Sequence, residues 1–307
     1  MTQTALILGA SGRFGRAAAA AFERAGWQVK RFQRGTETLS QVAVGVDVIV
    51  NSWNPAYPDW AKQVPSLHRQ VIGAAEMSGA TVILPGNVYV FGPQTPFPWS
   101  EQSPHAAQNP LGRIRVEMEA AYRASKAQVI VLRSGDYLDT EASGNWFDAM
   151  ITAKLGRGKF IYPGRADIPH AWGYLPDKAR AAVGLAEKRA DLPRFVDVPF
   201  AGYTLTGHEL LAAINAHLHQ PAKLSQMSWL PLQLARPFWP LGRCLLEMRY
   251  LWDTPHSLSG DLLQQLLPDF QVTPVAQALP HCLPEALLIP QTGRRGLKAE
   301  GSGGLAA

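Results

Sequence analysis

A glycine-rich turn near the N-terminus constrains this chain more than any other feature. The sequence LILGASGRFG covers residues 6–15 and leads into the alanine-rich stretch 17–21. This order predicts a buried strand, a tight turn and the start of a helix, which bring free backbone N–H groups and the positive end of a helix dipole to one point. The pyrophosphate of a dinucleotide fits such a point.

The three glycines of this turn have separate expected roles. Gly9 permits the tight turn, Gly12 lets the backbone approach phosphate groups, and Gly15 lets the helix pack close to the sheet. A chance glycine cluster in a loop is the alternative, but it does not account for a strand before the turn and a helix after it. The residues of this segment expected to bind the cofactor are Gly9, Ser11, Gly12, Arg13, Phe14 and Gly15.

The second apolar segment, 27–32, indicates which dinucleotide binds. NAD sites usually carry an acidic residue at the end of this strand, where it accepts hydrogen bonds from the ribose 2′-OH. The first acid here is Glu37, whereas Arg31 and Arg34 stand at the strand end. Guanidinium groups hold a 2′-phosphate through paired charge-assisted hydrogen bonds, which favours NADP, with NAD as the alternative. A solvated basic strand end is the competing explanation for the two arginines.

Strand and helix patterns alternate along the first two thirds of the chain. Repeated βα units with short connections predict an α/β fold, a Rossmann-type doubly wound parallel sheet. Ligands of such sheets bind beyond the carboxyl ends of the strands, where Asn51, Ser52, Trp53 and Gly86 fall and complete this part of the predicted cofactor site. The expected strands are 4–8, 27–32, 46–51, 80–84 and 128–132, and the expected helices are 13–25, 60–78, 111–125, 144–155 and 177–188, the last with Asp177 as its N-cap.

The composition changes after about residue 199, where prolines become frequent and tryptophans gather from Trp229 to Trp252. We expect residues 1–198 to form the dinucleotide-binding domain. Residues 199–292 would form a smaller, mostly helical region that covers the substrate and is interleaved with 134–176. Its aromatic residues are interpreted as core, because three prolines interrupt any long amphipathic helix and argue against a membrane-surface role. A further helix is expected at 208–217 and a disordered tail at 293–307.

Composition also narrows the class of protein and its compartment. No apolar run reaches the roughly 18 residues of a membrane span, and no secretory signal pattern opens the chain. Cys244 and Cys282 form neither a metal motif nor a disulfide framework, which predicts a cytoplasmic protein without a metal. The net charge of +5 comes from scattered basic residues rather than a dense stripe, so an anionic cofactor explains it better than nucleic acid does.

Four segments resemble the extended or atypical short-chain dehydrogenase/reductases of the NAD(P)-dependent epimerase/dehydratase type. They are residues 9–15, 47–51 (DVIVN), 87–93 (NVYVFGP) and 133–137 (RSGDY). The third is similar to the family segment that carries a catalytic serine, and the fourth to the element after the fifth strand. The resemblance covers roughly residues 3–200 and implies a Rossmann fold with a nicotinamide cofactor. Many relatives pair through two helices per subunit, so a homodimer is one expectation.

This resemblance fails at the residues that carry the family's catalysis. Members use a Tyr and a Lys four residues later on one helix face, and the Tyr exchanges a proton with the substrate while hydride moves. The matching positions here are Leu111 and Arg115, and the family's serine position falls near Gly86 or Asn87. Leu111 cannot transfer a proton. Arg115 can still bind ribose hydroxyls as a cation, so it remains a cofactor-binding and catalytic candidate.

Two interpretations follow from this departure. In the first, the chain is an oxidoreductase or epimerase-like enzyme in which Tyr89 replaces the missing acid and Asn87 stands beside it as a hydrogen-bond donor. A packed aromatic accounts for Tyr89 equally well. The substrate would be a small, fairly apolar carbonyl or hydroxyl compound. The other candidates for the substrate pocket are Tyr137, Asp136, His170, which also fits a structural histidine, and Tyr174.

In the second interpretation there is no turnover. A chain that keeps the glycine turn and lacks the Tyr-Lys pair fits a sensor or regulator that binds NADP(H), as in NmrA-like relatives. A sensor would bind a partner protein and distinguish oxidised from reduced cofactor by affinity, whereas an enzyme would consume one of them.

Overall fold

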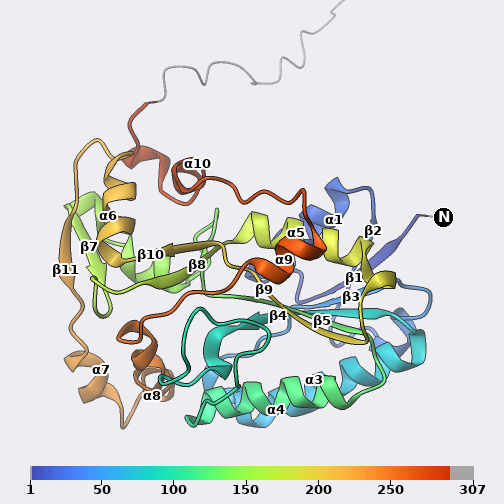
Figure 1. Ribbon diagram of the computed structural model, residues 1–307. Coiled ribbons are helices and arrows are strands. Elements are labelled where there is room, and N and C mark those ends of the chain that lie inside the picture. The colour runs from blue at the N-terminus through green and yellow to red at the C-terminus, as the bar shows by residue number, and fades with distance from the viewer. Residues whose placement is uncertain (1, 291–307) are drawn as a thin grey trace, which may run out of the picture.

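A six-stranded parallel sheet forms the centre of the computed structural model, which describes residues 2–290 (Figure 1). The strand order is β2-β1-β3-β4-β5-β9. The chain adds β2 on one side of β1 and all later strands on the other side, so the direction of winding reverses between β1 and β3. Ligands of open parallel sheets bind at such a reversal, beyond the carboxyl ends of the strands. The strands are β1 (Thr4–Leu8), β2 (Gln28–Arg31), β3 (Val48–Asn51), β4 (Thr81–Asn87), β5 (Val129–Ser134) and β9 (Phe195–Pro199). The predicted tail, 293–307, lies outside the described residues.

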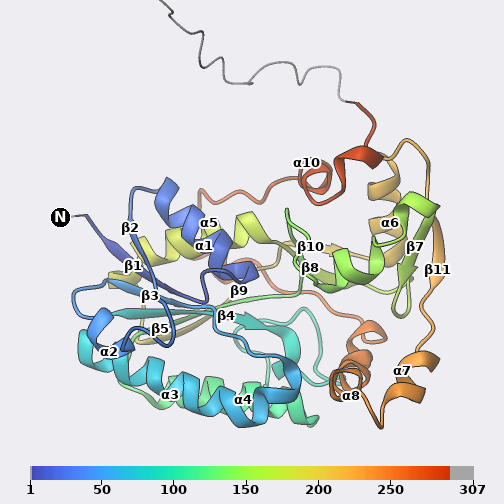
Figure 2. The same cartoon turned by 180° about the vertical axis from the view of Figure 1, so that it is seen from behind.

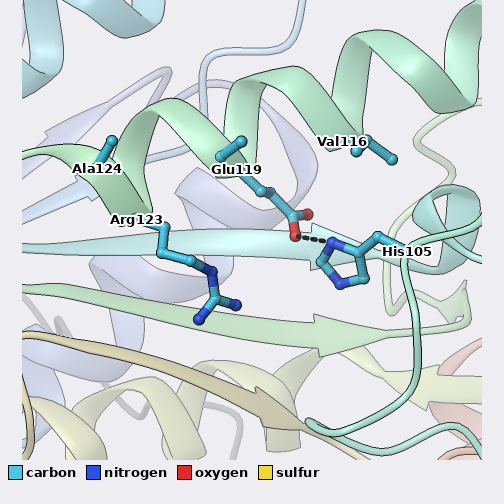
Figure 3. Close-up of a pocket in the computed structure, with 6 residues that line it drawn as sticks. His105, Val116, Glu119, Arg123 and Ala124 are labelled. Atoms are coloured by element: carbon cyan, nitrogen blue, oxygen red, sulfur yellow. Dashed lines mark ion pairs between the residues drawn. The ribbon is translucent and has the colours of Figure 1, made fainter.

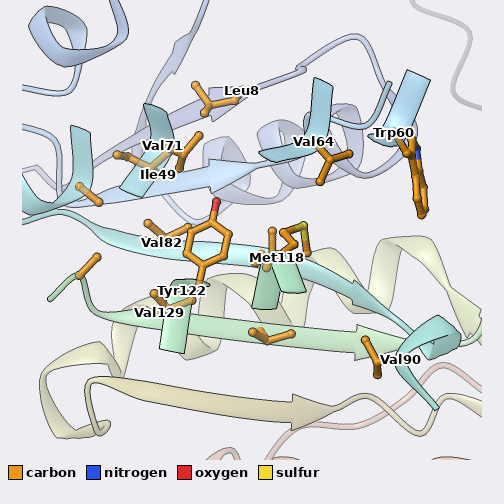
Figure 4. Close-up of a cluster of buried hydrophobic side chains, with 14 of the residues drawn as sticks. Leu8, Ile49, Trp60, Val64, Val71, Val82, Val90, Met118, Tyr122 and Val129 are labelled. Carbon is orange, nitrogen blue, oxygen red and sulfur yellow. The ribbon is translucent and has the colours of Figure 1, made fainter. Parts of the chain in front are cut away.

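Helices cover both faces of this sheet (Figures 1 and 2). On one side lie α1 (Arg13–Arg24) and α5 (Leu175–Glu187), and on the other lie α3 (Trp60–Ser78) and α4 (Pro110–Ala124) with the short α2 (Leu39–Val42). Strand side chains alternate between the two layers, as the pleat requires: Leu6 packs toward α3 and α4, and Ile7 toward α1 and α5. Figure 4 shows the core between the sheet and helices α3 and α4, where apolar side chains of the strands and the helices pack together.

The doubly wound parallel sheet predicted from the sequence is confirmed, and its sixth strand is an addition. All five expected strands are present, and β9 (Phe195–Pro199) extends the sheet beside β5. The segment FVDVP escaped prediction because it is short and carries a charged residue at its centre. Asp197 is buried there and pairs with Arg133 of β5, which is how the sheet accommodates a carboxylate.

Two local predictions were wrong. The helix expected at 144–155 is a five-residue π-helix, Phe147–Ile151, followed by a single 3-10 turn. The Asn145 and Asp148 side chains accept hydrogen bonds from the backbone amides at its start, which favours a capped turn over a full helix. Asp177 is not an N-cap, because α5 begins at Leu175 and the Asp177 carboxylate accepts hydrogen bonds from the amide and hydroxyl of Thr273.

A second group of elements sits beyond the carboxyl ends of the main strands (Figure 1). It contains a three-stranded sheet, β10-β8-β6, and the pair β11-β7. Trp229 and Trp252 are buried in its core, as expected, and Trp172 joins them there, whereas Trp239 is 41% exposed. None of the helices within residues 2–290 is long and apolar enough to cross a membrane. The elements are β6 (Asp136–Leu138), β7 (Lys159–Tyr162), β8 (His170–Tyr174), β10 (Tyr203–Leu205), β11 (Lys223–Gln226), α6 (Gly207–Asn215), α7 (Leu230–Ala235), α8 (Pro240–Glu247) and α10 (Val275–Ala278). The short α9 (Asp261–Leu266) returns to the main sheet, where it packs in the layer of α1 and α5.

Candidate functional site

A cavity of about 860 Å³ opens at the carboxyl ends of β1, β3, β4 and β5. Its volume suits a cofactor or a drug-sized ligand. The glycine turn forms one wall, the ends of β3 and β4 form a second, and the segment after β5 forms a third. The predicted cofactor-binding residues that line it are Ser11, Gly12, Arg13, Phe14, Asn51, Ser52, Trp53 and Arg115.

The glycine turn and the start of α1 pack too closely to accept side chains at Gly9 and Gly15. Gly9 has φ +72°, and its carbonyl accepts a hydrogen bond from the Gly12 amide at 2.9 Å. A Cβ on Gly15 would lie 2.1 Å from the Gly9 oxygen, so α1 approaches β1 only because residue 15 has no side chain. Gly9 and Gly15 therefore shape the wall from behind, while Ser11 and Gly12 face the cavity.

The donors around this turn fit the phosphates and ribose of a dinucleotide. The N-cap of α1 is Gly12, which has no side chain to occupy the free amides, and no acidic residue stands in the first turn. Ser52 Oγ and Arg115 Nε are buried in the cavity wall without a hydrogen-bond partner in the described part of the protein. Buried polar atoms normally have partners, so these two indicate a ligand that supplies acceptors.

The two arginines predicted to select NADP have different surroundings. Arg31 is exposed and Nη2 bonds to Glu23 Oε1 at 2.7 Å. Arg34 is also exposed and has no ion pair with any of residues 2–290. Neither lines the cavity, but Phe32 between them packs against Trp53, which does. Of the two guanidinium groups, that of Arg34 is the one without an ion pair among residues 2–290.

Arg115 is a buried cation on the cavity wall. It is 6% exposed, its guanidinium lies 3.9 Å from the Trp60 ring centroid, and Nη2 donates to Asn54 Oδ1 at 2.5 Å. No carboxylate forms an ion pair with it in the part of the chain that the structure describes. Burial lowers the pKa of Arg115, although Glu119 acts in the opposite direction. Leu111, one helical turn earlier, is buried in the core and cannot reach a substrate.

Tyr89, the acid proposed from the sequence, lines the cavity and is held in a pair. Its hydroxyl is 2.6 Å from the hydroxyl of Tyr57, and its backbone amide donates to Asn87 Oδ1 at 3.0 Å. The Asn87 oxygen thus caps this turn, which leaves its amide NH2 group as the donor expected from the sequence. Burial raises the pKa of Tyr89 well above its ordinary value, and Tyr57 adds to that effect.

The further pocket candidates divide into two groups. Tyr137 and Asp136 line the cavity. His170 is buried behind it, bonded through Nε2 to Asp136 Oδ2 at 2.8 Å and stacked on Trp252 at 4.4 Å between centroids. Tyr174 is buried in the core of the second group of elements. His170 and Tyr174 are both on β8, and neither lines the cavity. Gly86 belongs to β4 and faces β5, where a Cβ would lie 2.7 Å from Val131, so it is also behind the wall.

Lys178 was missed by the sequence reasoning. It is 0% exposed, and Nζ donates to Tyr137 OH at 2.9 Å, to Ser134 Oγ at 3.0 Å and to the Gly86 carbonyl at 3.4 Å. Burial lowers its pKa well below the ordinary value, and the charge of Arg133 adds to this. A signal existed, since Lys178 shares the apolar stripe of α5 with Ala182 and Leu185.

A second cavity, of about 340 Å³, lies between α4 and the loop that carries His105 (Figure 3). His105, Glu119 and Asp197 come close enough there to hold a cation. The two carboxylates, however, already accept charge-assisted hydrogen bonds from Arg133, which is 0% exposed. The guanidinium supplies the positive charge that a metal would otherwise provide, so we treat this cluster as a structural ion network.

No protein-family model matches the sequence, and no curated protein matches it. Solved structures match along nearly the whole chain. Human epimerase family protein SDR39U1 (isoform 2) with NADPH is 17% identical, with a TM-score of 0.70 over 90% of this chain and 98% of that one. UDP-glucose 4-epimerase from Brucella ovis in complex with NAD is 15% identical, with a TM-score of 0.69 over 91% and 97%.

A dTDP-4-dehydrorhamnose reductase from Clostridium acetobutylicum is 14% identical, with a TM-score of 0.67 over 90% of this chain and 97% of that one. Identity at this level establishes the fold and leaves substrate and chemistry to the residues of the site. The chain has the Rossmann-type fold of the nucleotide-sugar epimerases, dehydratases and reductases, as its resemblance to the extended short-chain dehydrogenase/reductases implied.

Proposed function

We propose that this protein is an NADP(H)-dependent oxidoreductase, or an epimerase-like enzyme that uses the same hydride transfer, acting on a small and fairly apolar carbonyl or hydroxyl compound. The observation that carries the proposal is a single cavity that joins the glycine turn to buried phenols and a buried cation. A regulator needs only the dinucleotide half of such a cavity. The structural neighbours bound to NADPH and NAD support the choice of cofactor.

The wall residues suggest how the ligands are arranged. The turn at Ser11 and Gly12 would hold the pyrophosphate, and Arg115, a cation on the cavity wall, would hold the nicotinamide ribose. Asn87 and Tyr89 would lie beside the reacting ring, where the sequence placed the catalytic groups. Beyond them the cavity wall is apolar, with Trp146, Met227, Leu232, Leu241 and Leu245. This wall favours a substrate with a hydrocarbon body.

The chemistry needs one contribution from the cofactor and several from the chain. When bound, the nicotinamide supplies or accepts a hydride at the substrate carbon. Arg115 would fix the ribose and hold a positive potential over the site, since burial strengthens its field. The apolar wall would exclude water, and a phenol at the cavity would hold the proton that the substrate oxygen gains or loses.

The experiment that tests this function begins with the wild-type protein. It is titrated with NADPH and NADH while nicotinamide fluorescence is followed. A panel of aromatic and aliphatic aldehydes and ketones is then added to the tighter complex while NADPH absorbance is recorded. Substrate-dependent loss of absorbance supports the enzyme. Tight binding with no turnover across the panel overturns it in favour of the sensor.

Cofactor selectivity gives a sharper prediction. Arg34→Ala should weaken NADPH by about tenfold or more and leave NADH within twofold, because only NADPH carries the 2′-phosphate that a guanidinium holds. Arg31→Ala, the matched variant, should have a smaller effect, since Arg31 is already bonded to Glu23. Dissociation constants for both cofactors check this, and equal losses for NADPH and NADH in Arg34→Ala would contradict it.

A further inference from the structure

The phenol of Tyr137 and the amine of Lys178 are joined at the cavity wall, although they come from different elements. Tyr137 belongs to β6, lines the cavity and is partly exposed to it. Lys178, in the first turn of α5, lies behind it and donates to its hydroxyl at 2.9 Å. Ser134, at the end of β5, lines the same wall and bonds to the amine at 3.0 Å. Phe14 of the glycine turn faces the amine at 5.2 Å.

Lys178 brings a buried charge to this wall without a counter-charge among the residues that it bonds to. All three hydrogen-bond acceptors of Lys178 are uncharged oxygens, and no carboxylate pairs with it. A buried lysine costs free energy unless its charge is paired, so it shifts toward the neutral amine. The lowered pKa of Lys178 agrees with that geometry. A neutral amine beside a phenol can accept its proton or donate a hydrogen bond to the phenolate.

We propose that Tyr137 is the catalytic acid and base of this site, with Lys178 and Ser134 as its positioning residues. The proposal rests on the proposed function and identifies which phenol donates the proton. In reduction, the carbonyl carbon gains the hydride and the carbonyl oxygen takes the phenol proton of Tyr137. The phenolate left behind is stabilised by the hydrogen bond from Lys178, whose amine Ser134 helps to orient, and it regains a proton from water when product leaves. The reverse direction uses the same groups.

Tyr89 is the competing acid, and its contacts make it the weaker one. Its hydroxyl is bonded to another phenol, Tyr57, at 2.6 Å, and no amine or guanidinium bonds to either hydroxyl in the part of the chain described. A phenolate at Tyr89 would therefore have only a neutral partner. Burial raises the pKa of Tyr137 to about 12, whereas that of Tyr89 is raised well above 10 with Tyr57 adding to the shift.

The test compares two identical changes in one cavity. Tyr137→Phe should lower kcat with the best carbonyl of the panel by about 100-fold or more, with the NADPH dissociation constant within twofold of wild type. Tyr89→Phe, a change at another phenol of the same wall, should lower kcat by less than about tenfold. Loss of kcat in Tyr89→Phe with an active Tyr137→Phe overturns the assignment and leaves the proposed function intact. A wild type that turns over no carbonyl overturns both.

The positioning role of Lys178 is tested by two measurements that a purely structural lysine would not affect. Lys178→Met keeps the volume and removes a buried amine, so the fold should persist. In the direction of alcohol oxidation, the pH at which kcat rises should be higher for this variant than for wild type. The Tyr137 phenolate has lost the hydrogen bond from Lys178, so the pKa of Tyr137 is higher. The Lys178 Cε resonance, assigned by its loss in that variant, should titrate well below the other lysines, with a midpoint that Tyr137→Phe changes. An ordinary midpoint, or an unchanged pH profile, contradicts the pairing.

A separate observation concerns the hairpin formed by α7 and α8 at one corner of the molecule (Figures 1 and 2). Its outer surface is apolar: Phe238 is 91% exposed, Leu234 70% and Leu230 57%. Arg236 and Arg243 are exposed beside these residues, and no acidic residue occurs between positions 224 and 246. The same hairpin contributes Leu232, Trp239, Leu241 and Leu245 to the cavity wall.

We infer that this hairpin docks on an anionic lipid surface and admits an apolar substrate from it. Exposed aromatic and aliphatic side chains enter the headgroup boundary, and flanking arginines meet lipid phosphates. The charge distribution favours lipid over a second copy of this chain, because symmetric pairing would bring the arginines of two hairpins together. On sequence alone, the prolines here argue against a membrane-surface role. In the structure they divide the segment into two short helices, α7 and α8, and the turn between them carries the exposed Phe238.

Vesicle cosedimentation tests this inference. Wild type should bind vesicles of phosphatidylcholine with phosphatidylglycerol, bind pure phosphatidylcholine less, and lose binding as salt rises. Phe238→Ser should weaken binding about tenfold. Met77→Ser, which removes a 69% exposed apolar side chain from α3, should not. Absence of vesicle binding, or a dimer in ultracentrifugation that Phe238→Ser dissociates, would overturn the lipid assignment.

Discussion

Gly15→Ala is expected to abolish dinucleotide binding, with the affinity for NADPH falling by two orders of magnitude or more, about 3 kcal/mol. The added Cβ would lie 2.1 Å from the Gly9 oxygen, 2.8 Å from the Gly9 carbonyl carbon and 3.1 Å from the Ala10 Cα. All three are backbone atoms of the turn, so no side-chain rotation relieves the contact. The turn must shift away from α1, and its amides then no longer converge on a phosphate.

Gly73→Ala is the matched control for this change. Gly73 lies inside α3, where a Cβ would have no neighbour within 4 Å. Alanine should leave the NADPH dissociation constant unchanged and raise stability by about 0.5–1 kcal/mol, the ordinary gain for Gly to Ala in a helix. Fluorescence titration and thermal unfolding of both variants check the pair. NADPH affinity retained in a folded Gly15→Ala would show that the dinucleotide does not bind at this turn.

The sequence predicted the sheet well because its first five strands are read from local patterns. Buried parallel strands are continuous apolar runs, and glycine turns and helices separate them. β9 departs from this pattern because its central residue is Asp197, a buried carboxylate. The ion pair with Arg133 on the neighbouring strand β5 stabilises it there. The short π-helix at Phe147–Ile151 likewise depends on side-chain caps that a helical pattern does not reveal.

The candidate site was predictable on the cofactor side and not on the catalytic side. The glycine turn is contiguous in sequence, so its geometry follows from a few adjacent residues. Tyr137 and Lys178 are 41 positions apart and meet only because β6 and α5 both start at the same edge of the sheet. The family pattern places the corresponding pair four residues apart on one helix. An expectation based on that spacing finds Leu111 and Arg115 and overlooks a pair assembled by topology.

Arg133→Met is expected to destabilise the protein by about 3–5 kcal/mol at neutral pH. Arg133 is 0% exposed and bonds to both oxygens of Glu119, at 3.1 and 2.6 Å, and of Asp197, at 3.2 and 2.5 Å. Its Nη1 also donates to the Asn87 carbonyl at 2.5 Å, which fixes the end of β4 beside the cavity. Methionine fills much of the space but leaves two buried carboxylates without their cation. Chemical denaturation measures the loss.

The pH dependence distinguishes this cause from a packing defect. Burial acts to raise the pKa of Asp197, but Arg133 and then His105 outweigh it, and the net pKa is below the ordinary value. In wild type this carboxylate therefore contributes stability above its unfolded pKa and loses it as pH falls through the folded one. Without Arg133, burial dominates, the folded pKa rises above the unfolded value, and the native state takes up protons first.

The stability gap between wild type and Arg133→Met should consequently be widest at neutral pH and narrow as pH falls toward about 4, near the ordinary carboxyl pKa values. Arg123→Met is the matched control, since Arg123 is an exposed residue of α4 that lies over the Phe195 ring. It should cost about 1 kcal/mol or less, with no such narrowing. A gap for Arg133→Met that stays constant with pH would mean that the loss comes from packing rather than from the uncompensated charges.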